Sequence, residues 1–262
     1  MRTEVARLDL RLRRRLVLSY TVGMALYALV VVVLYPSFKD STSLNQLTKN
    51  GSAVAALFGA TGSLTSPTGW LDANIFENFL PLIMLLTTIG YGASCVAGQD
   101  EDGTLALAVT LPVSRRSVLL QKVITLAAQA ILIGVVTMLC VVTGRGFDLS
   151  ISLVHLAGLT VGVVLLGIDF GLLALAVGCA TGSRGMALGS AAAVAAVSYL
   201  IGSLAPVVAW IRPARFASLF YWSVGDQQLA DGISIGAVAV LLAVGVVLAV
   251  VSVSALRRLD VR

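Results

Sequence analysis

Six apolar runs, each long enough to cross a lipid bilayer, constrain this chain more than any other feature. They occupy residues 16–35, 75–97, 118–142, 153–180, 186–208 and 233–256. A helix needs roughly 20 mostly apolar residues to span the hydrocarbon layer. Only 12% of the residues are charged, against about a quarter in an ordinary soluble domain. The sequence therefore predicts an integral membrane protein.

The runs are predicted to be helices. Lipid offers no hydrogen-bond partner to backbone N–H and C=O groups, and a helix satisfies these groups within itself. Strands of a membrane barrel would instead alternate polar and apolar residues, and these runs do not alternate. We expect an all-α membrane protein in which residues 1–262 form a single transmembrane domain of six helices.

The distribution of positive charge predicts the orientation. An even number of spans places both termini on the same side, and that side would carry thirteen of the 18 lysines and arginines, against five on the other. Cytoplasmic loops are enriched in these residues, so both termini are expected in the cytoplasm. The net charge of +5 then reflects topology and contact with anionic lipid, and we do not expect nucleic-acid binding.

Residues 1–15 precede the first run and are rich in arginine. A helical arrangement places Val5, Leu8 and Leu12 on one face, with arginines around much of the rest. This pattern fits a short amphipathic helix lying in the membrane interface. A simple basic anchor explains the same residues, and both interpretations stay open.

The segment between the last two runs carries several aromatic side chains. They are Trp210, Phe216, Phe220, Tyr221 and Trp222. Aromatic residues collect where the membrane meets water. We therefore interpret them as an interfacial belt, in preference to a role in releasing a substrate.

Several kinds of chemistry are excluded by what the chain lacks. It has one histidine, His155, which is too few for a histidine metal cluster. Ser94 and His155 would lie near opposite ends of their spans, about 30 Å apart, so they cannot form a serine protease pair. No lysine stands in a GxxxxGK[ST] phosphate-binding loop. If ATP is used, another chain must bind it.

Asp169 is the only acid deep within an apolar run. An ionised carboxylate there costs about 2.5–3.5 kcal/mol on insertion scales, so it should face protein or water, or be protonated. It could relay protons or contact a substrate. Because no charged partner occurs within another run, we favour a hydrogen bond that packs two helices together.

The segment 98–116 interrupts the apolar pattern, and residues 99–116 read QDEDGTLALAVTLPVSRR. Its acids would stand at a helix start, where the dipole favours negative charge. Leu105 and Val109 share one face of the helix that follows. Pro112 disfavours continuation, and Ser114 can cap the next helix. The segment predicts a short cytoplasmic helix with acids at one end and bases at the other.

This order of residues resembles the ABC-2 type transporter permeases, the membrane subunits of ABC exporters. In that family an acid, Gly-Thr-Leu, an apolar stretch and Leu-Pro-Val-Ser-Arg join the second and third spans. The matching residues here are Glu101, Gly103, Thr104, Leu105, Leu111, Pro112, Val113, Ser114 and Arg115, followed by Lys122. The six-span layout and the stretch FASLFYW before the last run extend the resemblance over the whole chain.

The resemblance implies that the segment is a coupling helix, which docks on a separate ATPase subunit. In such complexes two permease subunits pair with two ATPase subunits, which bind the ATP and Mg²⁺; this chain holds no cofactor. The residues that the resemblance assigns to ATPase coupling are Glu101, Gly103, Thr104, Leu105, Val109, Leu111, Pro112, Ser114 and Arg115. Among the three neighbouring acids we favour Glu101 as the ATPase contact, and Asp100 and Asp102 stay open.

The sequence thus predicts the permease subunit of an ATP-driven exporter, which moves an amphipathic substrate outward across a bacterial plasma membrane. One alternative is a membrane anchor or assembly subunit that docks an ATPase without conducting anything. Another is a secondary transporter driven by protons through Asp169. Neither the cargo nor the identity of the second permease subunit, whether the same chain or a different one, follows from the sequence.

Overall fold

The computed structural model describes residues 4–39, 64–101, 115–225 and 228–258. Within these ranges the chain is helical and contains no strand, as the sequence predicts. Six helices are long and apolar enough to cross a membrane, and they run over Asp9–Phe38, Pro67–Gly98, Arg116–Phe147, Leu153–Thr181, Arg184–Leu204 and Ile235–Leu256. The prediction of an all-α membrane protein with six transmembrane helices is confirmed.

The individual elements subdivide these long helices and the segments between them. In chain order they are α1 (Glu4–Phe38), α4 (Pro67–Leu71), η1 (Asp72–Phe76), α5 (Phe79–Ala93), η2 (Ser94–Gly98), α6 (Gln99–Glu101), α8 (Arg115–Val142), η3 (Thr143–Phe147), α9 (Leu153–Thr181), α10 (Arg184–Leu204), η4 (Arg212–Ala217), α11 (Leu219–Val224), α12 (Gln228–Asp231) and α13 (Ile235–Arg258). The arginine-rich start of the chain belongs to α1, which continues without interruption into the first span.

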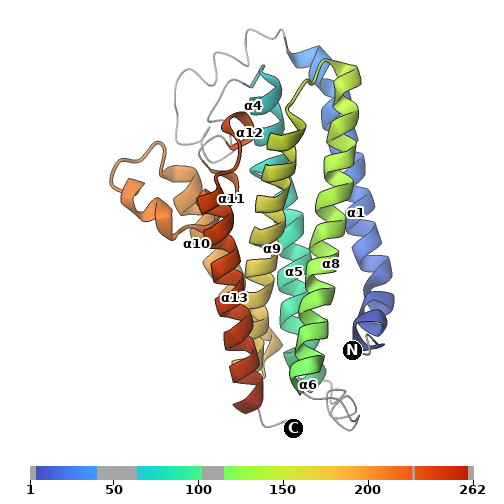
Figure 1. Ribbon diagram of the computed structural model, residues 1–262, viewed down its shortest axis with the longest axis vertical. Helices are drawn as coiled ribbons and strands as arrows, with labels where there is room; N and C mark the ends of the chain where they lie inside the picture. Colours follow the sequence, from blue (N-terminus) through green and yellow to red (C-terminus); the bar gives the residue numbers. More distant parts are fainter. Residues whose placement is uncertain (1–3, 40–63, 102–114, 226–227, 259–262) are drawn as a thin grey trace.

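The long helices form an elongated bundle (Figure 1). The start of α1, the end of α13 and α6 lie at one end, which we call the α6 end. The opposite end carries α4 and α12, and we call it the α4 end. The start of the first described helix and the end of the last therefore lie at the same end of the bundle, as an even number of crossings requires.

Helix α9 occupies the centre of the bundle. It packs against α5, α8, α10, α11 and α13, which suits a helix that is apolar on all sides. Its contact with α5 is unusually close, because the Gly171 carbonyl takes the space that a Gly92 Cβ would need. A Cβ on Gly171 would itself lie 2.6 Å from Cδ1 of Leu126 on α8. Small residues at both positions allow the two backbones to meet.

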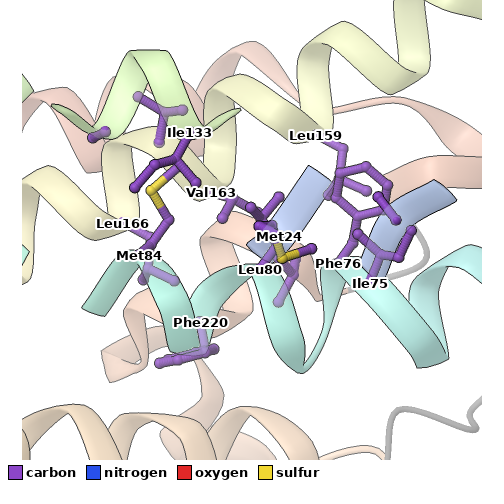
Figure 2. Packing of buried hydrophobic residues seen from close by; sticks show 14 of the residues in the cluster. Met24, Ile75, Phe76, Leu80, Met84, Ile133, Leu159, Val163, Leu166 and Phe220 are labelled. Atoms are coloured by element: carbon purple, nitrogen blue, oxygen red, sulfur yellow. The ribbon is translucent and has the colours of Figure 1, made fainter. Parts of the chain in front are cut away.

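The core is built from large apolar side chains of α1, α5, α8 and α9. Met84 extends from α5 toward Ile133 of α8 and Leu166 of α9 (Figure 2). All three side chains are fully buried. Because lipid is as apolar as these side chains, the contact stabilises the bundle mainly through close van der Waals packing.

The second long helix begins earlier than the apolar pattern indicates and is broken. The sequence predicts a span over 75–97, whereas the helix begins at Pro67, after Ser66 caps it by accepting a hydrogen bond from the Gly69 N–H at 3.1 Å. Asn78 leaves the helical conformation between η1 and α5, with φ −123° and ψ −74°. Its amide donates to the Ala73 carbonyl at 2.8 Å. Polar residues therefore stabilise the break. Because the residues at the helix start are also polar, the apolar pattern does not include them.

The segment between α10 and α13 folds back against the bundle. Ser218, at the start of α11, donates to the Ser198 carbonyl at 2.6 Å, and the Leu219 N–H donates to the Ser198 hydroxyl at 3.0 Å. Phe220 is buried, with its ring centroid 5.3 Å from that of Tyr199. The belt interpretation is wrong for Phe220, because α11 packs on α9 and α10. Trp210, 81% exposed, remains at the surface.

Candidate functional site

A buried ion pair stands at the α6 end of the bundle. Lys122 Nζ of α8 lies 3.3 Å from Asp9 Oδ2 of α1, and the two side chains are only 2% and 9% exposed. The Tyr91 hydroxyl donates to the same carboxylate at 2.8 Å. Lys122 also donates to Gln99 Oε1 at 3.0 Å. We call Asp9, Tyr91, Gln99 and Lys122 the Asp9 cluster.

The Asp9 cluster joins four helices, which are α1, α5, α6 and α8. An isolated charge at this depth would be costly, whereas each charge here has an opposite charge and further hydrogen bonds. The Arg13 guanidinium lies over the Tyr91 ring, 5.0 Å from its centroid, and adds a cation–π contact. The cluster therefore fixes the first helix to both flanks of the segment 98–116.

Glu101 makes a second connection at the same end. Its Oε1 accepts a hydrogen bond from the backbone N–H of Arg184 at 2.8 Å, and Arg184 is the first residue of α10. The Ser183 hydroxyl accepts from the Met186 N–H. A carboxylate at a helix start is favoured by the exposed N–H groups and the helix dipole. Glu101 thus attaches α6 to the beginning of α10.

The remaining residues of the predicted coupling segment lie mostly outside the described residues. These are Gly103, Thr104, Leu105, Val109, Leu111, Pro112 and Ser114. Arg115 begins α8. The structure therefore places the two flanks of the segment, with Glu101 leading in and α8 leading out.

The sequence analysis missed Asp9, Tyr91 and Gln99. Two signals could have found the site. Asp9 is an acid among arginines, four residues before Arg13 on the same helical face. Lys122 lies inside the third apolar run, where a cation needs a partner, so the expectation that no other run holds a charge was wrong for this residue. Neither signal could identify the partner, because Asp9 and Lys122 are separated by 113 residues.

An apolar groove of about 670 Å³ lies between α5 and α10. Its wall includes Leu82, Leu85 and Leu86 of α5 and Leu188 and Ala192 of α10. We call it the α5–α10 groove. It has the size and lining of a site for an apolar ligand body.

A second cavity, of about 620 Å³, adjoins the groove and carries charged side chains. Glu77, Arg212, Arg215 and Asp231 line it, together with polar and small residues of α10 and α11. We call it the polar cavity. Glu77, Tyr199 and Phe220 line both spaces, so the apolar groove continues into the polar cavity.

Asp169 lines neither space. It is 1% exposed and faces α13, where a Cβ on Gly245 would lie 2.8 Å from its Oδ1. Its Oδ2 has no hydrogen-bond partner among the described residues. The structure therefore places Asp169 in the contact between α9 and α13, apart from the groove and from the Asp9 cluster.

Asp169→Asn should leave folding and function largely intact, because asparagine keeps the shape and the polar atoms while removing the ionisable group. Gly245→Leu is the contrasting variant, since its side chain would enter the space of Asp169 and separate α13 from α9. We expect normal membrane abundance for Asp169→Asn and reduced abundance for Gly245→Leu, measured by quantitative immunoblotting of membranes. An Asp169→Asn variant that is abundant but has lost transport would show that the carboxylate is functional.

A comparison with protein families gives a match. The family described as ABC-2 family transporter protein matches residues 4–259. The match spans all six long helices, the Asp9 cluster and the whole of the segment 98–116. The comparison with curated proteins gives no match.

Proposed function

The chain belongs to the ABC-2 family of transporter proteins, and from this premise we propose that it is the permease subunit of an ATP-driven exporter. As a multi-pass membrane protein of this family, it is a transport subunit. The observation that carries the proposal further is the double attachment of the segment 98–116. Gln99 and Lys122 tie its flanks to α1, and Glu101 ties it to α10.

We propose that residues 102–114 dock on a separate ABC ATPase subunit. The complex would contain two such ATPase subunits, and these would bind ATP and Mg²⁺. A force applied to this segment then reaches α1 through the Asp9 cluster and α10 through Glu101. Helix α10 forms one wall of the α5–α10 groove, so the same connection reaches the proposed substrate site. Glu101 keeps its proposed contact with the ATPase and acts in addition as the link to α10.

The orientation follows because an ATPase must bind ATP in the cytoplasm. The α6 end carries the docking segment and most of the basic residues, so we assign it to the cytoplasmic face of a bacterial plasma membrane. The polar cavity then lies toward the outer face. The apolar part of an amphipathic substrate would bind in the α5–α10 groove. A second permease subunit, either an identical chain or a different one, would complete the complex.

A reconstitution experiment tests this proposal against its alternatives. The chain is co-purified with its partner ABC ATPase, placed in proteoliposomes and supplied with a fluorescent amphiphile. An exporter moves the amphiphile only when ATP is hydrolysed. An anchor subunit would support ATP hydrolysis without any movement, and a proton-driven transporter would move the amphiphile under a pH gradient without ATP. Either of these two results would overturn the proposal.

A further inference from the structure

Glu77 lies where the α5–α10 groove meets the polar cavity. It follows η1 directly and precedes the break at Asn78, so it projects from the point where the second long helix is interrupted. Together with Tyr199 and Phe220 it lines both the α5–α10 groove and the polar cavity. Glu77 is the only acid of the described residues that lines the groove. Any ligand that fills the groove and reaches the polar cavity must pass its carboxylate.

The Glu77 carboxylate forms no ion pair with any of the described residues. Among the described residues, the ion pairs are Lys39–Asp148 and Lys122–Asp9, and no hydrogen bond to the Glu77 side chain is found. The neighbouring Asn78 amide is already engaged, because its Oδ1 accepts from the Tyr199 hydroxyl at 2.8 Å. Ionising a half-buried carboxylate without a partner is costly, and a cationic ligand beside Glu77 would favour the ionised form.

The aromatic rings beside Glu77 suit the same kind of ligand. Tyr199 and Phe220 meet edge to face, with centroids 5.3 Å apart, and both line the groove where it meets the polar cavity. The face of an aromatic ring attracts an organic cation. An acid and two aromatic rings at the end of an apolar groove are therefore complementary to a positive charge attached to an apolar body.

The two arginines of the polar cavity do not cancel this preference. Arg215 covers the rings of Phe216 and Tyr221, 4.8 and 5.1 Å from their centroids. Arg212 is exposed at the surface. Neither lines the α5–α10 groove, so a ligand body in the groove meets Glu77 before it meets a cation.

We propose that the α5–α10 groove and Glu77 together form a binding site for lipophilic organic cations. The apolar body of the ligand fills the groove, and its positive charge lies against the Glu77 carboxylate and the rings of Tyr199 and Phe220. As a statement about transported cargo, this rests on the proposed exporter function. As a statement about binding, it stands on the geometry of the site alone.

The test uses two probes of nearly the same shape and opposite charge, tetraphenylphosphonium and tetraphenylborate. Binding to the full-length chain in a neutral detergent is measured by equilibrium dialysis, without ATP or a partner subunit. We expect the phosphonium to bind about tenfold more tightly than the borate, and Glu77→Gln to weaken phosphonium binding about tenfold, or ~1.4 kcal/mol. Asp148→Asn is the control, because this exposed acid lines neither space and should change binding less than about twofold.

Two results would overturn the inference. If Glu77→Gln binds the phosphonium as tightly as the unaltered chain, the carboxylate is not part of a cation site. If the borate binds more tightly and loses affinity in Arg215→Gln, the site takes anionic amphiphiles. The binding assay is also independent of the exporter proposal. Binding without ATP-dependent transport would reject only the exporter, and transport unaffected by Glu77→Gln would reject only the assignment of cations as cargo.

Discussion

Replacing Lys122 with methionine is expected to destabilise the folded chain by about 3–5 kcal/mol, the usual cost of removing one partner from a buried ion pair. The variant removes the cation paired with the Asp9 carboxylate, which is 9% exposed, and removes the hydrogen bond from Lys122 to the Gln99 oxygen. We expect a lower melting temperature in detergent and reduced abundance in the membrane. Fluorescence-detected size-exclusion chromatography after heating measures both.

Two further variants separate this effect from a general loss of charge. Combining Asp9→Asn with Lys122→Met removes both charges, keeps an acceptor for the Tyr91 hydroxyl, and should recover most of the lost stability. Lys39→Met breaks the ion pair with Asp148 at the α4 end, where the two side chains are 36% and 69% exposed. Exposed pairs contribute little, so this variant should behave like the unaltered chain. Equal stability of Lys122→Met and the unaltered chain would contradict the proposed role of the Asp9 cluster.

Replacing Leu105 with aspartate is expected to abolish ATP-dependent export while leaving the permease in the membrane. The substitution places a charge on the face proposed to enter the ATPase surface. Disrupting a central interface residue often costs about 2 kcal/mol or more, roughly thirtyfold in affinity. The change lies outside every span, so membrane abundance should be normal. Co-purification of the ATPase and export in proteoliposomes measure the two expected losses.

A matched control is available at the opposite end of the bundle. Ser66→Asp introduces the same charge, and aspartate caps a helix as well as serine does, so α4 should persist and export should be unchanged. Glu101→Lys is a less specific variant than Leu105→Asp. It removes the acceptor for the Arg184 N–H, so it alters the attachment of α10 together with any contact to the ATPase. Normal ATPase binding and export by Leu105→Asp would mean that the segment is only a loop.

Much of the fold could be predicted from the sequence because lipid imposes a simple requirement. A run of about 20 apolar residues must satisfy its own backbone, so length and composition are enough to predict a helix. The start of the second helix was missed because its cap and its break are polar, with Ser66 at the first and Asn78 at the second. Apolar runs carry no information about such positions.

The candidate sites were less predictable, because they depend on residues far apart in the chain. Tyr91 lies 82 residues from Asp9, the residue to which its hydroxyl donates. The pattern of FASLFYW predicts aromatic side chains near an interface, yet it cannot show that α11 packs on α9 and buries Phe220. The docking role of the segment was predicted from its resemblance to a family, and that resemblance does not reveal that Glu101 holds α10.

The contact between Gly92 and Gly171 limits which movements the bundle can make. With the Gly171 carbonyl set against the α-carbon of Gly92, sliding α5 along α9 would drive neighbouring side chains into backbone. Shear motion consists of small sliding displacements between packed helices. The close approach of the Gly92 and Gly171 backbones opposes such sliding between α5 and α9. We therefore expect α5 and α9 to move together, so that a change in the width of the α5–α10 groove comes from displacement of α10.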